Sequence, residues 1–245
     1  FIASFLISCV IVFALVFLVS YWRGKDLAAA SFQGLSASYS NTGYMGIPLC
    51  ALALGQDGLA PAIISTFVVF VMFALATIFI EIGILSHKKH HEIILSVLKS
   101  LCTNPLLIAP VAGLLWASSG LVMYDPVAQV ISFLAGASTP CALVSIGLFL
   151  MQKSDASPSQ TWGISAMKLL IQPLIAWLIA GPILDLPPLW LSAAVILSAL
   201  PTGTGPFMLA QYYKADGRLI SRVVLVTTVG SLITLSSILW WNGRV

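Results

Sequence analysis

The sequence carries very little charge. Only 8% of its 245 residues are Asp, Glu, Lys or Arg, whereas 59% are apolar. Soluble globular chains are about 25% charged, because their surfaces face water. A soluble fold is therefore excluded, and the composition is that of an integral membrane protein. The net charge of +3 comes from 11 basic residues spread along the whole chain, which also excludes a nucleic-acid-binding surface.

Groups that carry enzyme chemistry are equally scarce. There are eight acidic residues and three histidines, and His87, His90 and His91 all lie in one short segment that we interpret as a basic loop at the lipid headgroups. The chain has no His-Glu-x-x-His motif, no Walker loop and no Ser nucleophile with an intramembrane His. Its four cysteines form no Cys-x-x-Cys pair and are interpreted as buried free thiols. We therefore expect no enzyme, no cofactor and no metal site.

Long apolar runs dominate what is present. A bilayer core of about 30 Å needs roughly 20 apolar residues in a helix. The runs do not alternate as the strands of a membrane barrel do, so the predicted fold is all-α with eight transmembrane helices. The predicted spans are 1–21, 27–54, 59–85, 105–123, 127–151, 161–183, 188–212 and 219–241.

Basic residues in the loops predict the orientation. The first, third, fifth and seventh loops together hold nine Lys and Arg residues, whereas the other side holds only Arg244. Because Lys and Arg are retained in the cytoplasm, both ends of the chain are predicted on the non-cytoplasmic side of a multi-pass protein, in the inner membrane if the origin is bacterial. Lys168 is left over within a span and is predicted to snorkel to the headgroups. Glu81 is interpreted as an interfacial carboxylate near Lys88 and Lys89.

Two of the spans contain Gly, Pro and hydroxyl residues at mid-membrane depth. They are 27–54, which includes Pro48, and 188–212, which includes Pro201. Helix breaks survive in a membrane only inside protein or beside a watery cavity. Two broken spans at matching positions of two halves indicate the binding site of a transporter.

The spacing of the two broken spans also predicts an internal repeat. A shift of 153 residues, from Pro48 to Pro201, brings the spans on either side of them into register, and the two copies differ by an odd number of helices. The expectation is therefore a ten-helix protein of two inverted five-helix repeats, with two helices and roughly 50 residues missing before Phe1. The predicted parts are 1–85 (last three helices of the first repeat), 86–104 (cytoplasmic basic loop) and 105–241 (second repeat).

Three runs resemble the auxin efflux carrier family, whose bacterial members include malonate and malate permeases. Asn41-Thr-Gly-Tyr-Met-Gly-Ile-Pro-Leu is similar to the signature of the family's fourth helix. Asn104-Pro-Leu-Leu-Ile-Ala-Pro-Val-Ala-Gly-Leu-Leu resembles the start of the sixth, and Leu200-Pro-Thr-Gly-Thr-Gly-Pro-Phe-Met-Leu-Ala-Gln resembles the ninth. The three runs are well separated and in the family's order, and the alignment covers the whole chain.

The resemblance implies that the broken fourth and ninth helices cross at the centre and that the substrate anion binds there. Many relatives carry Asn where this chain has Gly205, so an amide contact from the second broken helix is in doubt. The bile-acid:sodium symporter family shares the general plan but fits the three runs less well. The substrate-binding positions that the resemblance implies are Asn41, Thr42, Gly43, Pro48, Thr139, Pro140, Pro201, Thr202 and Thr204.

The predicted function is secondary transport of small organic anions, mono- or dicarboxylates such as malonate or malate, by alternating access. The predicted partners are the anion, a coupling proton or sodium ion and the lipid bilayer, and a homodimer stays open. The alternative is an ion channel, or a membrane protein without transport activity in this truncated form. Thr42-Gly-Tyr-Met-Gly resembles a potassium filter only faintly, because its residue order differs and a filter lies in a re-entrant loop.

Overall fold

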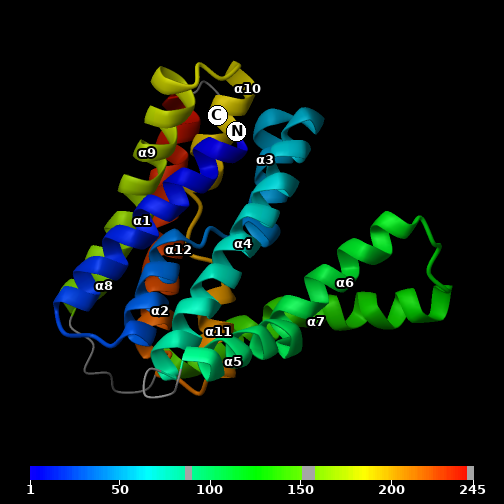
Figure 1. The fold of residues 1–245 in the computed structure, drawn as a ribbon. Coiled ribbons are helices and arrows are strands. Elements are labelled where there is room, and N and C mark those ends of the chain that lie inside the picture. Colours follow the sequence, from blue (N-terminus) through cyan, green and yellow to red (C-terminus); the bar gives the residue numbers. More distant parts are fainter. Residues whose placement is uncertain (86–89, 151–157, 242–245) are drawn as a thin grey trace.

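The computed structural model describes residues 1–85, 90–150 and 158–241, and every regular element within these ranges is helical (Figure 1). The prediction of an all-α fold is thereby confirmed for the described residues. In chain order the elements are α1 (Ile2–Trp22), α2 (Leu27–Ser38), π-helical turn η1 (Thr42–Gly46), α3 (Ile47–Leu54), 3₁₀ turn η2 (Gln56–Gly58), α4 (Leu59–Ile84), α5 (His90–Thr103), α6 (Pro105–Ser119), α7 (Asp125–Leu150), α8 (Pro158–Ala166), π-helical turn η3 (Met167–Ile171), α9 (Gln172–Leu178), π-helical turn η4 (Ile179–Ile183), α10 (Pro188–Ser198), α11 (Gly205–Tyr212) and α12 (Arg218–Trp241).

Several of these helices match the thickness of a bilayer. Within the described ranges, four helical stretches are long and apolar enough to cross a membrane, and a pair bent by 57° at Asn104 makes a fifth if it counts as one span. The number of eight spans, and the inverted repeat, stay predictions. The four stretches are Ile2–Trp22, Gln56–Ile84, Pro158–Ile183 and Arg218–Trp241.

Both spans that were predicted to be broken are interrupted in the structure. The first leaves the helix after Ser38 with Tyr39 in an extended conformation, and the second is interrupted between α10 and α11, where Pro201 lies. Pro201 lacks an N–H and disfavours helix in the preceding residue, which explains the second break. Pro48 was expected at the first break but lies in the first turn of α3. Because proline lacks an N–H, Pro48 cannot donate a backbone hydrogen bond back into η1, the π-helical turn that directly precedes α3.

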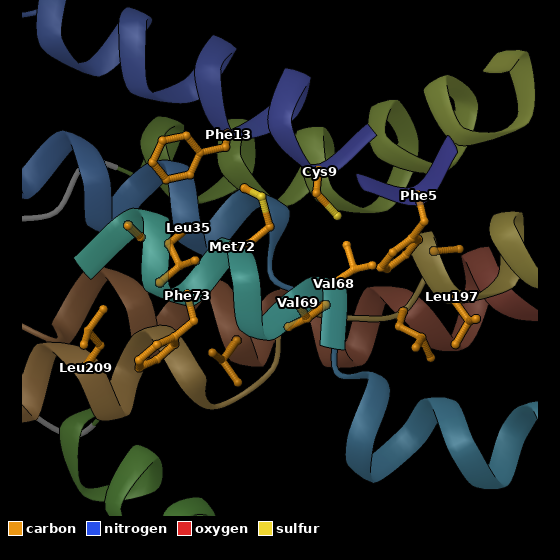
Figure 2. Close-up of a cluster of buried hydrophobic side chains, with 14 of the residues drawn as sticks. Phe5, Cys9, Phe13, Leu35, Val68, Val69, Met72, Phe73, Leu197 and Leu209 are labelled. Atoms are coloured by element: carbon orange, nitrogen blue, oxygen red, sulfur yellow. The ribbon is translucent and has the colours of Figure 1, made fainter. Parts of the chain in front are cut away.

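The core lies where α1, α2 and α4 pack on the second broken span. Figure 2 shows Cys9 of α1, Leu35 of α2, Met72 of α4 and Leu197 of α10 pointing into one buried cluster. Each of these four side chains is at most 1% exposed. Because lipid is as apolar as these side chains, they stabilise the bundle by close packing and not by removal from water. This packing holds both broken spans in place.

The middle of the chain forms an arm that Figure 1 shows extending away from the bundle. The arm consists of the apolar helices α6 and α7. The helix α5, which falls within the segment predicted as a basic loop, packs against α4 and joins the arm to the bundle. Asn104 Oδ1 accepts a hydrogen bond from Leu106 N at 2.9 Å, and Pro105 begins α6. An Asn cap followed by Pro at the first helical position starts a new helix, which explains the bend after α5.

Candidate functional site

The two helix breaks meet through their backbones. Ser40 and Thr202 form an isolated antiparallel bridge. Asn41 N donates to Pro201 O at 2.9 Å, and Gly203 N donates to Tyr39 O at 3.0 Å. Backbone groups freed by a helix break need partners inside a membrane, and here each break supplies them to the other. We call the paired segments 39–41 and 201–203 the crossing.

Glycine permits the close approach at the crossing. A Cβ on Gly203 would lie 3.0 Å from Tyr39 Cε1, and one on Gly205 would lie 2.5 Å from Tyr39 Cζ. The second distance is shorter than any ordinary carbon contact, so position 205 has no room for a side chain.

Two helices begin beside the crossing and leave hydrogen-bond donors free. Within the described residues, the backbone N–H of Gly43 in η1 and that of Gly205 at the start of α11 have no acceptor. The Asn41 side-chain amide, which is partly exposed, makes no hydrogen bond to the described residues either. Unpaired N–H groups at helix N-termini carry partial positive charge and bind anions. Free donors of this kind are the groups that recognise a carboxylate.

Threonine side chains tie the second break to its neighbours. Thr202 Oγ1 donates to Ser36 O at 2.7 Å, and Thr202 N donates to Thr227 Oγ1 at 3.1 Å. Both threonines are buried. The Thr202 hydroxyl thus satisfies a backbone carbonyl of α2, so in this conformation Thr202 supports the crossing and leaves the free donors to Asn41 and the two glycines.

Lys168 lies at the crossing, so the prediction that it snorkels to the headgroups is wrong. Its side chain is 0% exposed. Lys168 Nζ donates to Ser40 Oγ at 3.0 Å and to Ser198 O at 2.7 Å. Lys168 belongs to the π-helical turn η3, which ends directly before the Gln172-Pro173 pair. Such turns occur frequently at functional sites. The backbone geometry directs this lysine inward, towards oxygens that two helix ends have left exposed.

Gln172, to which the sequence assigned no role, is the second polar residue that the tertiary structure adds. It follows Lys168 by four residues, and Gln172 Nε2 donates to Ser38 O at 3.2 Å. Residues four apart share one face of a helix, and an ionisable residue within a span is a functional candidate by default. Lysine and glutamine at that spacing in an apolar run were therefore a usable signal in the sequence.

The structure gathers some of the predicted positions and leaves others apart. Asn41, Thr42, Pro201 and Thr202 lie at or next to the crossing, and Gly43 follows within η1. Thr204 precedes α11 and its hydroxyl contacts Met208 Sδ at 3.8 Å. The positions that the structure does not bring to the crossing are Pro48, exposed on α3, and Thr139 and Pro140, both on α7 in the arm.

Glu81 forms a separate polar contact near the predicted cytoplasmic end of α4. Tyr213 Oη donates to Glu81 Oε1 at 2.7 Å, and Ser100 Oγ of α5 lies 3.0 Å from the same hydroxyl. Burial raises the pKa of Tyr213 and the Glu81 carboxylate raises it further, so the phenol stays protonated and keeps donating. Lys88 and Lys89, the expected neighbours of Glu81, lie outside the described residues.

The Tyr213→Phe variant is expected to lower stability by about 1–2 kcal/mol, because the Glu81 carboxylate loses a charge-assisted hydrogen bond. Thermal unfolding in detergent measures the change. Tyr212→Phe is the matched control, since the Tyr212 hydroxyl makes no hydrogen bond within the described residues. Equal melting temperatures for the two variants would mean that the contact with Glu81 contributes nothing.

The chain is similar in sequence to known membrane transport proteins. The profile of the family described as "Membrane transport protein" matches residues 1–239. The chain is 30% identical over 97% of its length to a Rhizobium meliloti protein named "Putative malonate transporter", of which the match covers 77%. It is 26% identical over 91% of its length to an "Uncharacterized transporter" of Methanocaldococcus jannaschii, covering 73% of that protein. An "Uncharacterized transporter" of Methanothermobacter thermautotrophicus is 28% identical over 87% of the chain, with 68% of that protein covered.

The family match spans nearly all of the chain, and the relatives that it resembles are named as transporters. Together with the apolar helices, these matches make the chain a multi-pass membrane protein of a transporter family and not an enzyme family. The chain belongs to the membrane transport protein family, the family of the auxin efflux carriers.

Proposed function

We propose that the protein is a secondary transporter of small organic anions, mono- or dicarboxylates such as malonate or malate. The observation that carries the proposal is the pairing of two broken helices with unpaired N–H groups beside the pair. The Asn41 amide and the N–H groups of Gly43 and Gly205 are unpaired donors of the kind that bind a carboxylate. The name of the Rhizobium meliloti relative favours malonate as the first substrate to test.

Access to the crossing has to alternate between the two sides of the membrane in such a transporter. A cavity of about 500 Å³ opens at the predicted cytoplasmic end and extends along α2 as far as Gln33. At 1.5 Å per residue, Ser38 lies about 8 Å further along the helix. Ser40 and Thr202 are no more than 1% exposed, so the crossing is closed from this side. We expect the helices around the crossing to move relative to the rest of the bundle during transport.

A channel is the competing class, and the Thr42–Gly46 run is its sequence argument. In the structure these residues form η1, a helical turn that continues into α3. The carbonyl oxygens of this run do not form an open row, because they lie along a helical turn in which Thr42 O accepts a hydrogen bond from Ile47 N. This geometry favours a carrier over a filter.

Uptake of labelled malonate and malate tests the proposal. The complete gene product is reconstituted in proteoliposomes, and proton and sodium gradients are imposed separately. Accumulation against the anion gradient, driven by one of the two ions, is the expected result. Flux that only follows the electrochemical gradient of the anion, at rates far above those of a carrier, would identify a channel instead.

A further inference from the structure

Lys168 is a fully buried lysine whose hydrogen bonds at the crossing all go to uncharged groups. Its ammonium donates to the Ser40 hydroxyl and the Ser198 carbonyl, and within the described residues it forms no ion pair with a carboxylate. An isolated ammonium in a membrane interior is costly. Some other source of negative potential has to stabilise it.

Two half-helices end at this ammonium and supply that potential. The helix α10 ends at Ser198, whose carbonyl accepts from Lys168 Nζ at 2.7 Å. The helix α2 ends at Ser38, two residues before Ser40, whose hydroxyl accepts at 3.0 Å. A helix C-terminus carries partial negative charge, so the two helix ends favour a positive charge at this position.

The same groups are those that bind a coupling cation in other secondary transporters. Half-helix C-termini and unwound backbone carbonyls coordinate sodium there, while half-helix N-termini face the anionic substrate. In this chain the Ser198 carbonyl and the Ser40 hydroxyl already accept hydrogen bonds from Lys168. The free N–H groups of Gly43 and Gly205 lie at the N-terminal ends of η1 and α11. A sodium ion at this place would lose its ligands and meet the ammonium charge.

We propose that Lys168 is the resident cation of the crossing and occupies the place of a coupling sodium ion. The lysine supplies the fixed positive charge that an anionic substrate needs, so binding of the anion requires no sodium. This inference rests on the proposed function. It excludes sodium as the ion whose gradient drives transport. Lys168 is on this view a positioning residue that also sets the charge of the site.

Sodium binding can be measured without knowing the substrate. The complete gene product is melted in detergent in choline chloride and in sodium chloride of equal ionic strength. The expected result is the same melting temperature in both salts, because the cation position is filled. Sodium-specific stabilisation that saturates with concentration would overturn the inference, since a bound ligand raises stability in proportion to ln(1 + [L]/Kd).

Substitution of Lys168 tests the role of its charge. Malonate binding is measured by calorimetry for Lys168→Gln, Lys168→Arg and, as the matched control, Lys99→Gln, which removes an exposed lysine of α5. We expect Lys168→Gln to weaken binding by at least about tenfold, because the anion loses the attraction of a fixed positive charge, and Lys168→Arg to retain more of the affinity. Lys99→Gln is expected to bind like the unchanged protein.

The outcomes separate this inference from the proposed function. Malonate affinity that is unchanged in Lys168→Gln, or equally weak in the Arg and Gln variants, would overturn a role for the charge of Lys168. An unchanged protein that neither binds nor transports malonate or malate would count against the proposed substrates alone. If Lys168→Gln does not fold, the comparison of sodium with choline on the unchanged protein still decides whether the cation position is filled.

Discussion

Replacing Asn41 by Ala is expected to lower the kcat/KM of carboxylate uptake by about ten- to a hundredfold, which corresponds to the loss of one hydrogen bond to a charged group. The reason is geometric. The Asn41 backbone is held by its bond to Pro201 O, so the side-chain amide stays beside the crossing when the substrate arrives. Within the described residues that amide has no other partner, so its removal should affect the substrate far more than the fold.

Initial uptake rates in proteoliposomes over a range of malonate concentrations measure this effect. Asn104→Ala serves as the matched control, because it removes an asparagine that caps α6 and lies away from the crossing. We expect the control to lower the melting temperature and to leave KM unchanged. Uptake by Asn41→Ala at the rate of the unchanged protein would remove this side chain from the site.

The second large effect is expected from a single methyl group at Gly205. Gly205→Ala places a Cβ about where the Tyr39 ring lies, 2.5 Å from Cζ. The ring also packs edge-on against Phe73, with ring centroids 6.1 Å apart, so it cannot simply swing away. Overpacking of this kind costs about 1–3 kcal/mol. Because the strain falls on the paired breaks, we expect uptake to drop by about tenfold or more.

A double variant shows whether the clash is the cause. Combining Tyr39→Ala with Gly205→Ala restores space, and the double variant is expected to be more stable than the sum of the single changes predicts, by at least about 1 kcal/mol. Gly163→Ala in α8 is the control, since a Cβ there meets nothing within 4 Å. Additive effects of the two substitutions on melting temperature would show that Tyr39 and Gly205 act independently.

Composition and local pattern were enough to predict the class of this protein. A chain with 8% charge and long apolar runs can satisfy its backbone in a bilayer only as helices or as a closed barrel, and the runs lacked the alternation of a barrel. Proline and glycine at mid-span also indicated both interruptions, since their effect on the backbone is local. Asn41 and Thr202 were placed correctly beside these interruptions for the same reason.

The direction of a side chain and the distance between segments were decided by the tertiary structure. Lys168 was predicted to reach the headgroups, because a lysine at that depth can snorkel. It turns inward because two helices from distant parts of the chain end beside it and expose oxygens to it. The need for glycine at position 205 likewise depends on Tyr39, a residue 166 positions earlier. These contacts cannot be predicted from the spacing of residues in the sequence, because they form only when the two broken spans pair.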